Sequence, residues 1–577
     1  MKVIVLEAVP EDPQMLVAWN DLVFRMERPE VFFTHQWALA ASRAFSASLS
    51  PKIFLIYETS RLAGIAAMAT TLRSPDTAFF LTASTADYCD IVSAPEARPA
   101  ILTALLEQMK GMGVQDLVLA NVPAESATLR ALAATAHSQG FHTHDRPGYD
   151  CGIIALEDKA QRQEVLHSVS RKVKEKRELK KLNQLGRVCV KNLSKEHLDT
   201  GLQAIFAAHI SRFLATNRLS PLIHAERRLF LTELCQLLSS AGWLRVSQLE
   251  VDGLAIAWNY GFLFDTRWFW YLPTFLIRYE EVSPGSCLLR LLTEEACADP
   301  TVTKVDLGLG DEPYKARFCN SVSSTRYVQL SQSVSRHLAN VGRYCLASNI
   351  SSFPVLESQL RNGRGRLRGQ NMSMVAIVTR LLTRVKRKIL SKNDVAFFEA
   401  PEMSVQASGG ASLNFICWEN LALAAMQNSD DQRTLDYLAR SGRRLRTGEM
   451  AGYCLQTQEL KALHFLWVAP YDGFYLSELD FTLESSDSSA VILFDCFTPT
   501  ELRKCGHYAT AIRLAAASLQ RQQRHVWIFS AIENAPSLIG IAKAGFVYRF
   551  SCSRNRRFGK VPISGQPREF SSTAFET

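Results

Sequence analysis

The chain has 577 residues, of which 47% are hydrophobic and 21% charged, a balance typical of a globular protein long enough for several domains. No window comes near the ~18 uninterrupted apolar residues of a membrane span. The N-terminus does not resemble a secretion signal, so we expect a cytoplasmic protein. The 13 cysteines are odd in number and include no CxxC pair, so we expect neither a disulfide framework nor a metal site.

The net charge of +9 is concentrated in one segment. Residues 361–392 hold ten lysines and arginines and no acid, within a stretch, 331–399, that we interpret as a basic linker. Apolar residues recur at helical spacing between 374 and 389, which predicts an amphipathic helix. This helix would dock on a neighbouring domain, or lie on the inner membrane or a synthase complex. Nucleic acid is the weakest alternative, because no aromatic residues interleave with the charges.

Residues 1–150 alternate between strand-like and helical segments. Strands are predicted over 52–72, as a pair joined by a turn, and over 78–84 and 114–123, and helices over 100–113 and 126–140. This alternation indicates an α/β or α+β unit. We interpret Asp87-Tyr88 as a turn at the edge of a strand.

Residues 151–330 show a similar alternation. The predicted order is a strand at 149–156, a basic helix at 166–186, a strand at 188–193, helices near 197–213 and 223–241, a three-stranded meander from 243, a helix from Ser283 to Cys297 and a strand at 304–310. Asp252-Gly253 is a hairpin signal within the meander. The basic helix fits a solvated face or a contact with phosphate or nucleic acid.

Several motifs of this region occur in the order found in one family. They are the basic run at 172–186, Asp252-Gly253, Ser283-Pro284-Gly285, Asp306 to Gly310, and Glu312-Pro313-Tyr314-Lys315-Ala316-Arg317-Phe318. With the segments FFTHQW and DYCDIV upstream, they resemble the BioF2-like acetyltransferase family, which includes proteins called cellulose biosynthesis protein CelD. That family is related to the FemABX peptidyltransferases, which consist of two GNAT-like folds in tandem. The resemblance implies a degenerate GNAT-like copy at 1–150 and a more complete one at 151–330.

The same region holds candidate site residues. Ser283 and Gly285 open a helix, where unpaired backbone N–H groups can bind the phosphates of an acyl-CoA. The resemblance implies that Lys315 lies in the active site, where it would stabilise an oxyanion. Asp311 and Glu312 are candidates to position or deprotonate an amine, and Tyr314 is a further catalytic candidate. A simple cluster of ion pairs in a loop is the alternative interpretation.

The C-terminal module, residues 400–560, is predicted to begin with a helix near 419–445, followed by strands. Its central stretch, 491–546, has the order strand, loop, helix, strand, helix, strand, and resembles the acyl-CoA-binding half of the GNAT family. The residues that carry this resemblance are Arg503 and Gly506 in the loop and Asn534, Ser537, Gly545 and Phe546 downstream. Lys504, Tyr508 and Ile541 depart from the family pattern, and Ile541 stands where many members have a catalytic tyrosine. The tail, 561–577, is expected to be disordered.

The resemblance implies a CoA site in this module. The expected cofactor-binding residues are Phe497, Thr498, Arg503, Lys504, Gly506, His507, Tyr508, Ala509 and Asn534. Glu478 and Asp495, each predicted on a strand, are the candidate bases for the acceptor. Cys505 lies in the loop, but a nucleophilic cysteine is not part of this family's direct transfer.

The predicted architecture is α/β (α+β), with tandem GNAT-like folds, mixed central sheets flanked by helices, and three modules. The predicted function is transfer of an acetyl or other acyl group from acyl-CoA directly to an amine or hydroxyl, with a small-molecule or saccharide acceptor. The CelD resemblance implies a role in exopolysaccharide or cell-envelope biosynthesis. Two alternatives stay open: FemABX-like aminoacyl transfer, and a non-catalytic CoA-binding scaffold of a polysaccharide synthase.

Overall fold

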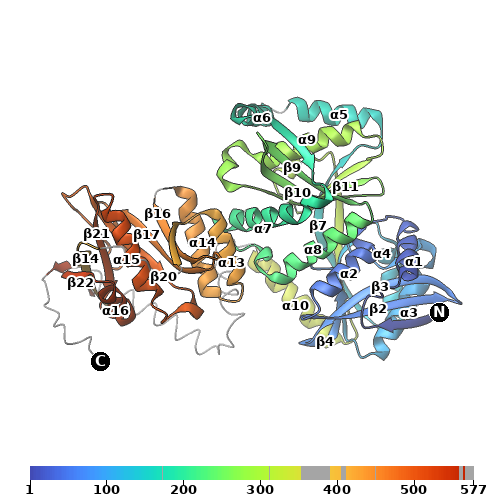
Figure 1. Ribbon diagram of the computed structural model, residues 1–577. Coiled ribbons are helices and arrows are strands. Elements are labelled where there is room, and N and C mark those ends of the chain that lie inside the picture. Colours follow the sequence, from blue (N-terminus) through green and yellow to red (C-terminus); the bar gives the residue numbers. More distant parts are fainter. Residues whose placement is uncertain are drawn as a thin grey trace. The chain divides into compact units, whose positions relative to one another are not determined.

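A computed structural model describes residues 1–171, 173–310, 312–351, 390–403, 411–448, 450–557 and 563–565. The chain divides into two compact units. Unit 1 comprises Met1–Phe206 and His224–Leu356, and unit 2 comprises Ala207–Ile223 and Glu357–Thr577. Each unit is described by itself (Figure 1).

Unit 1 is built on one mixed sheet of 13 strands. The strands are β1 (Lys2–Leu6), β2 (Leu49–Glu58), β3 (Arg61–Thr71), β4 (Ser74–Phe80), β5 (Val92–Ser93), β6 (Asp116–Pro123), β7 (His142–Ala155), β8 (Val188–Asn192), β9 (Leu244–Val251), β10 (Leu254–Phe264), β11 (Arg267–Phe275), β12 (Lys304–Leu309) and β13 (Ser321–Ser331). Their order across the sheet is β1-β2-β3-β4-β6-β13-β7-β12-β11-β10-β9-β8, with β5 beside β3. The hairpin predicted at Asp252-Gly253 is confirmed, because both residues have positive φ and join β9 to β10.

Helices flank this sheet. They are α1 (Pro13–Phe24), α2 (His35–Ala44), α3 (Arg98–Gly111), α4 (Ala127–Ser138), α5 (Lys159–Arg171), α6 (Val173–Leu185), the first part of α7 (Leu198–Ala215), α8 (Ala225–Ser240), α9 (Pro284–Ala298) and α10 (Val334–Ser351). Short 3-10 turns are η1 (Val31–Phe33), η2 (Pro95–Ala97), η3 (Lys195–His197), η5 (Ile277–Val282) and η6 (Lys315–Arg317). The rest of α7, from Ala207, and the turn η4 (Pro221–Ile223) belong to unit 2. Figure 1 shows α5, α6 and α9 beside β9, β10 and β11, where Leu288, Leu289 and Leu292 of α9 are part of the buried core.

Unit 2 contains a second mixed sheet, of eight strands in the order β15-β16-β17-β20-β21-β14-β22-β23. The strands of unit 2 are β14 (Leu390–Glu399), β15 (Ala411–Phe415), β16 (Ala451–Thr457), β17 (Ala462–Pro470), the small pair β18 (Tyr475–Leu476) and β19 (Phe481–Thr482), β20 (Ala490–Phe497), β21 (His525–Ala531), β22 (Val547–Arg557) and β23 (Ile563–Gly565). Its helices are α13 (Trp418–Gln427), α14 (Gln432–Thr447), α15 (His507–Gln520) and α16 (Ala535–Lys543), with a 3-10 turn η7 (Thr500–Leu502).

Within the described residues, one order of elements occurs three times. A strand, two helices and three antiparallel strands are followed by a helix that leads to a parallel partner of the third of these strands. We call these the first copy (β1 to β7), the second copy (β8 to β12) and the third copy (β15 to β22). The parallel pairs are β4 with β6, β11 with β12, and β20 with β21, and the crossing helices are α3, α9 and α15. The predicted fold class, mixed sheets flanked by helices, is therefore confirmed.

The first and second copies share one sheet. β13 pairs with both β6 and β7, and β7 pairs with β12, so the two copies are joined through these strands. The boundary suggested at residue 150 lies inside β7, which runs from His142 to Ala155.

The interpretation of residues 331–399 as a linker is wrong at both ends. Residues 334–351 form α10, which ion pairs of Arg336 with Asp76 and Asp116 fasten to the first copy. Residues 390–399 form β14, which lies inside the sheet of unit 2 between β21 and β22. The amphipathic helix predicted at 374–389 lies outside the described residues. The expectation of a disordered tail at 561–577 is wrong for residues 563–565, which form β23 and pair with β22, and the rest of the tail lies outside the described residues.

Two predicted helices are each divided in the structure. The basic helix at 166–186 corresponds to α5 and α6, on either side of residue 172. The helix at 419–445 corresponds to α13 and α14. The break falls before Asp431, whose side chain caps α14 by accepting from the N–H groups of Arg433 and Thr434. No helix within the described ranges is long and apolar enough to cross a membrane.

Candidate functional site

The parallel strands of the second copy separate soon after they pair. β11 pairs with β12 only over Arg267–Phe269, opposite Lys304–Asp306. Beyond these residues the two strands no longer pair with each other, although β11 continues to Phe275 and β12 to Leu309. Side chains engage the β12 backbone in this region, because the Gly308 N–H donates to Asp306 and the Gly308 and Leu309 carbonyls accept from Lys315. Since β11 no longer pairs with β12 beyond Phe269, we call this region the β11/β12 opening.

The crossing helix α9 begins near the far end of β11. Ser283, at its N-cap, has φ 47° and makes no side-chain cap bond, and Pro284 starts the first turn. The first-turn N–H groups of a helix are left without intrahelical partners and attract anions. A Cβ on Gly285 would lie 3.5 Å from the Phe275 ring, an ordinary contact, so packing alone does not require glycine there. The predicted phosphate site at Ser283 and Gly285 thus has the expected helix-start geometry.

A cluster of buried charged groups lies where the first and second copies meet. The Asp306 carboxylate is fully buried, accepts 2.9 Å from the Tyr88 hydroxyl, and lies 3.9 Å from the Arg28 guanidinium. Glu30, also fully buried, pairs with Arg28 and with Arg267. Burial is the main cause that raises the pKa of Asp306, and the Glu30 carboxylate adds to it.

Asp87, next to Tyr88, points its carboxylate at the strand end of β12. It accepts from the Leu309 N–H, and a Cβ placed on Gly308 would lie 2.6 Å from Asp87 Oδ2. Gly308 has φ +72°, which favours glycine, so this position provides room for the Asp87 carboxylate. Burial and then the Asp306 charge raise the pKa of Asp87 to about 7, although its side chain stays partly exposed to solvent.

Lys315 holds the turn that follows β12. Its buried ammonium donates to the carbonyl oxygens of Leu309 at 2.6 Å and Gly308 at 3.4 Å, and pairs with Glu312 at 2.7 Å. The Tyr314 hydroxyl accepts from the Trp270 indole at 3.2 Å. Lys315 therefore orders the backbone beside Asp87, and its role at an oxyanion stays a prediction. Asp311 lies outside the described residues.

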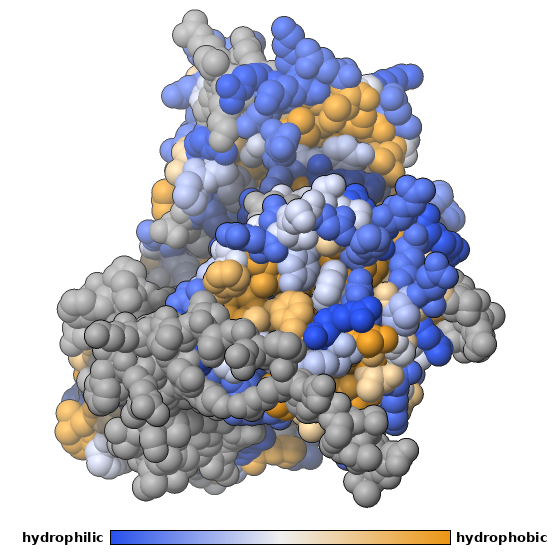
Figure 2. Space-filling model, turned by 90° about the vertical axis from the view of Figure 1, so that its left-hand side faces the viewer, coloured by the Kyte–Doolittle hydropathy of each residue, from blue (hydrophilic) through white to orange (hydrophobic). Residues whose placement is uncertain are grey.

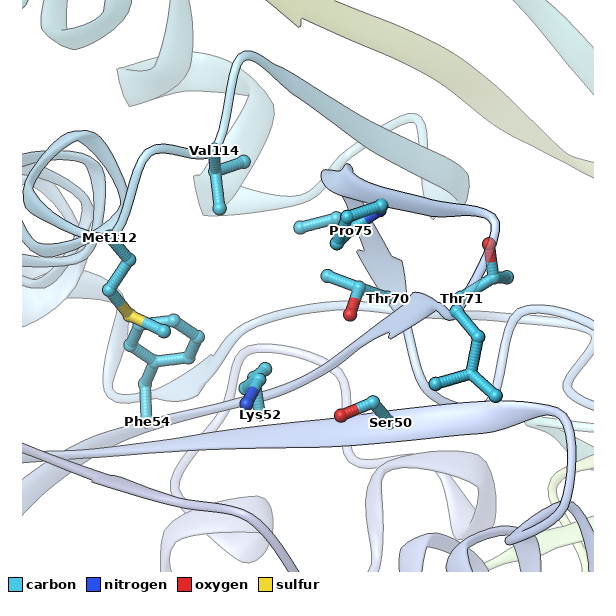
Figure 3. Close-up of a pocket in the computed structure, with 10 residues that line it drawn as sticks. Ser50, Lys52, Phe54, Thr70, Thr71, Pro75, Met112 and Val114 are labelled. Atoms are coloured by element: carbon cyan, nitrogen blue, oxygen red, sulfur yellow. The ribbon is translucent and has the colours of Figure 1, made fainter.

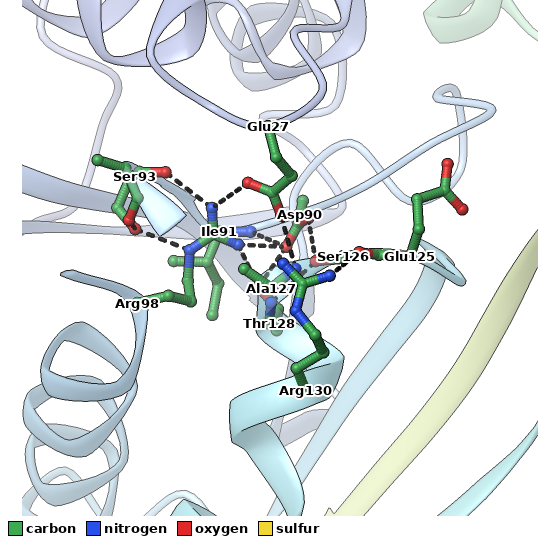
Figure 4. A network of polar contacts seen from close by, with 11 residues as sticks. Glu27, Asp90, Ile91, Ser93, Arg98, Glu125, Ser126, Ala127, Thr128 and Arg130 are labelled. Carbon is green, nitrogen blue, oxygen red and sulfur yellow. Dashed lines mark hydrogen bonds and ion pairs between the residues drawn. The ribbon is translucent and has the colours of Figure 1, made fainter. Parts of the chain in front are cut away.

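In the first copy the equivalent helix start is occupied by the protein itself. Arg98, at the start of α3, is completely buried and donates to Asp90, Ser93 and Thr128 (Figure 4). The Asp90 carboxylate also accepts from Ser126 at 2.5 Å. These side-chain contacts lie at the start of α3, whereas Ser283 at the start of α9 makes no side-chain cap bond.

The first copy also contains a cavity of about 300 Å³ between the ends of β2, β3 and β4 and the turn after α3 (Figure 3). Lys52, Phe54, Thr70 and Met112 are among its lining residues. None of the residues predicted from the sequence lines it. The Lys52 ammonium already pairs with Glu7 at 2.9 Å.

The third copy has an opening of the same kind. β20 pairs with β21 only over Ala490–Leu493, and continues without it to Phe497. α15 begins just after Gly506, whose φ of +81° is the left-handed conformation that glycine adopts readily. The predicted loop residues Arg503, Lys504 and Cys505 are exposed in front of this helix start, and His507, Tyr508 and Ala509 form its first turn.

Two predicted residues at the end of β20 contact groups that sequence reasoning missed. Phe497 stacks on the Tyr437 ring at 4.3 Å, and the Arg503 guanidinium lies 5.8 Å from the Phe497 centroid. The Thr498 hydroxyl lies 2.7 Å from Nδ1 of His464, a fully buried residue of β17. Burial, with a smaller effect of His507, lowers the pKa of His464 to about 3, so the ring is neutral.

The downstream GNAT-like block lies close to the helix start. Ser537 shares a hydrogen bond of 3.1 Å with the Tyr508 hydroxyl, and Asn534 is the N-cap of α16. Ile541 and Phe546 are buried in the core of unit 2, and Gly545 adopts φ +91° before β22. Burial raises the pKa of Tyr508, so its hydroxyl stays protonated.

The two predicted bases of this module differ from expectation. Glu478 is not on a strand: it lies in an exposed turn between β18 and β19, with its carboxylate beside Ser477. Asp495 is on β20 as predicted, but its carboxylate forms an ion pair of 2.8 Å with Arg444. The role of either carboxylate as a base stays a prediction.

Figure 2 shows one face of the molecule, on which hydrophobic patches are bordered by hydrophilic residues, an ordinary feature of protein surfaces. Among the described side chains, no group of three or more His, Cys, Asp or Glu could hold a metal ion.

The comparison with protein families agrees with the position of the β11/β12 opening. Residues 170–316 match the family model described as "Acetyltransferase (GNAT) domain". The matched residues include β8 to β12, α9 and Lys315. The predicted resemblance of this part of the chain to GNAT acetyltransferases is confirmed.

Solved structures with some likeness to the chain include FemX, at 9% identity over 59% of this chain and 99% of that chain, with a TM-score of 0.42. Others are the C-terminal domain of a putative lysylphosphatidylglycerol synthetase from Agrobacterium fabrum (11% identity, 57% and 94% covered, TM-score 0.37) and a tandem GNAT protein from the clavulanic acid biosynthesis pathway (12%, 57% and 97%, TM-score 0.33). Scores this low support no conclusion about activity. No curated protein matches the chain.

Proposed function

We propose that the chain is an acyl-CoA-dependent acyltransferase whose active centre is the β11/β12 opening of unit 1. The observation that carries the proposal is the coincidence of the GNAT domain match with an opening between parallel strands and an uncapped helix start. The acyl group, most simply acetyl, would pass directly to an amine or hydroxyl. A role in exopolysaccharide or cell-envelope biosynthesis rests on the CelD resemblance.

The geometry supports a division of roles along β11. Pro284 has no N–H, and the Ser286 N–H already donates to the Ser283 carbonyl at 3.0 Å, so at the start of α9 the Gly285 N–H would bind the CoA phosphates. From Phe275 back to Trp270 the strand rises by about 3.3 Å per residue, so an extended pantetheine arm has roughly 16 Å of strand to lie along. The thioester would then lie near Trp270 and Gly308, where β11 and β12 separate.

The third copy is a second candidate CoA site, because its β20/β21 opening and the Gly506 helix start repeat the same arrangement. The charges of Arg503 and Lys504 would add to the attraction for phosphates. This site would either catalyse a second transfer or bind CoA without turnover, and the ion-paired Asp495 favours binding alone.

Acetyl-CoA titration calorimetry on the full chain tests these proposals. Gly285→Asp puts an anion in the first turn of α9, which suits the helix dipole but repels phosphates. Arg503→Glu replaces a positive charge by a negative one in the loop before α15, which repels phosphates at the third copy. We expect Gly285→Asp to remove the binding that supports turnover and Arg503→Glu to remove a second binding event.

The outcome of the titration is decisive for each site. Acetyl-CoA binding that survives Gly285→Asp at full stoichiometry would exclude the α9 site, and unchanged binding in Arg503→Glu would exclude the third-copy site. A protein that binds no acetyl-CoA but transfers an amino acid from charged tRNA would support FemABX-like transfer instead, an alternative favoured by the exposed Arg177, Lys180 and Lys181 on α6.

A further inference from the structure

The β11/β12 opening of the second copy receives a side chain from the first copy. Asp87 lies between β4 and β5, outside the matched GNAT domain, yet its carboxylate reaches the backbone of Gly308 and Leu309 on β12. A Cβ on Gly308 would also lie 3.8 Å from the Trp270 carbonyl oxygen on β11. The Asp87 carboxylate therefore stands where the two strands separate.

Asp87 differs from the other acids around it in being reachable. Asp306 and Glu30 are fully buried and are held by Tyr88, Arg28 and Arg267. Asp87 is partly exposed. A carboxylate that solvent can reach at this point can also meet an acceptor that enters the opening.

The groups around Asp87 have opposite effects on the stability of its negative charge. Asp306 and Glu30 repel its charge, whereas the Lys315 ammonium and the Leu309 N–H stabilise it. The neighbouring Tyr271, Cys89 and Cys151 are protonated, because burial raises the pKa of each. With burial, this balance gives Asp87 a pKa of about 7, the range in which a carboxylate is an effective general base near neutral pH.

We propose that Asp87 is the general base of the second copy's acyl transfer and that the acceptor is a primary amine. This assignment rests on the proposed function. An amine acceptor arrives as an ammonium, whose pKa is about 10.4 for a lysine-like group. The pKa of a hydroxyl is far higher, with bulk water at about 15.7 as a guide. A base with a pKa of about 7 therefore removes a proton from the ammonium far more readily than from a hydroxyl.

Asp87 takes one proton from the ammonium, and the free amine nitrogen attacks the thioester carbonyl carbon to form the C–N bond. The C–S bond breaks when the tetrahedral intermediate collapses, and CoA leaves as a thiolate. The second proton of the attacking nitrogen neutralises that thiolate, so the products are an amide and free CoA.

Asp87→Asn tests the assignment, because the amide keeps an acceptor for the Leu309 N–H but cannot take a proton. The assay would use the full-length protein and measure the free thiol that is released from acetyl-CoA. Water, ethanolamine, L-lysine and D-glucosamine would be compared as acceptors. We expect amine-dependent release to fall about 100-fold or more, acetyl-CoA binding to stay within twofold, and the limb of the pH–rate profile near pH 7 to disappear. Asp145→Asn, the same change at an acid that pairs with Arg326 on the surface, serves as the control.

Stability supplies a readout independent of turnover. A carboxylate with a raised pKa destabilises the fold when it ionises, so Asp87→Asn should raise the melting temperature at pH 8 relative to pH 5. Amine-dependent release that survives Asp87→Asn would overturn the assignment. So would a variant that loses acetyl-CoA binding or is less stable at both pH values, because Asp87 would then be structural. No thiol release by the wild-type protein would overturn the proposed acyl transfer itself, and this assignment with it.

Discussion

The Tyr88 hydroxyl donates a 2.9 Å hydrogen bond to Asp306 Oδ2 across 218 positions of sequence, and both side chains are completely buried. Tyr88 belongs to the first copy and Asp306 to the parallel pair of the second. The bond therefore ties the two copies together directly beside the β11/β12 opening. A buried carboxylate that loses a donor keeps its desolvation penalty without the compensating bond.

Tyr88→Phe should accordingly destabilise unit 1 by about 1–3 kcal/mol. The measurement is urea unfolding, with hydrogen exchange of peptides from β12 to report on unit 1. Tyr149→Phe, at an exposed tyrosine, is the control and should change stability by less than about 0.5 kcal/mol. Equal stability of Tyr88→Phe and the wild type would mean that Asp306 does not depend on this donor.

A comparison of Gly308→Ala with Gly113→Ala should distinguish the effect of crowding Asp87 from the effect of backbone strain. The new Cβ would lie 2.6 Å from Asp87 Oδ2 and would also require an alanine at φ +72°. Gly113 has φ +79° and nothing within 4 Å of a Cβ, so Gly113→Ala carries the strain alone, about 1 kcal/mol. We expect Gly308→Ala to lose more stability than Gly113→Ala and at least tenfold in thiol release, whereas Gly113→Ala keeps its rate. The same rate in both variants would show that the position of Asp87 does not matter.

Local sequence patterns predicted most of the elements near the sites. The paired strands at 52–72, the hairpin at Asp252-Gly253 and the helix after Ser283 all depend on short-range periodicity and turn chemistry, and all occur in the structure. The helix start at Gly506 has the same origin. Each of these features depends on residues that lie within one or two neighbouring elements of the sequence, and sequence patterns carry information over this range.

The missed features depend on contacts across the chain. Asp87 looks like a turn residue in sequence, and only the sheet that joins the first and second copies brings it to Gly308. The basic run before β14 suggests a linker. The buried residues Val395 to Phe398 of β14, however, are a short apolar run typical of a central strand. His464 is a lone polar residue within an apolar strand, and this pattern was the one sequence feature that could have drawn attention to it.

The central place of β14 predicts a large effect of Phe397→Ala. Phe397 is fully buried and stacks on Phe550 of β22 at 4.8 Å. Removal of a buried phenyl ring costs about 3–5 kcal/mol, measured as loss of hydrogen-exchange protection in β21 and β22. Phe415 stacks on Tyr453 at a similar 4.9 Å but is 63% exposed, so Phe415→Ala should cost less than about 1 kcal/mol. Similar losses in both variants would contradict a central position of β14.

The buried histidines of unit 2 predict a loss of stability in mild acid. The pKa of His464 and that of His209 are each lowered from 6.5 to about 3, mainly by burial. The unfolded chain therefore binds protons between about pH 6.5 and 3 that the folded unit does not. The contribution of each neutral ring is fully present above pH 6.5 and is lost as the pH falls through this window, at up to about 1.4 kcal/mol per pH unit and group.

His464→Gln should reduce this pH dependence by about half, because His209, which bonds Ser220 at 2.8 Å, still contributes. The free energy of unfolding of unit 2 would be followed by urea and hydrogen exchange of β16 and β17 peptides at pH 7, 6 and 5, corrected for the intrinsic exchange rate. The double variant with His209→Gln should lose nearly all of the dependence. If His464→Gln retains the wild-type slope, folding does not lower the pKa of His464. The folded protein would then protonate this ring in mild acid, and the ring would donate to Thr498 beside the third-copy opening.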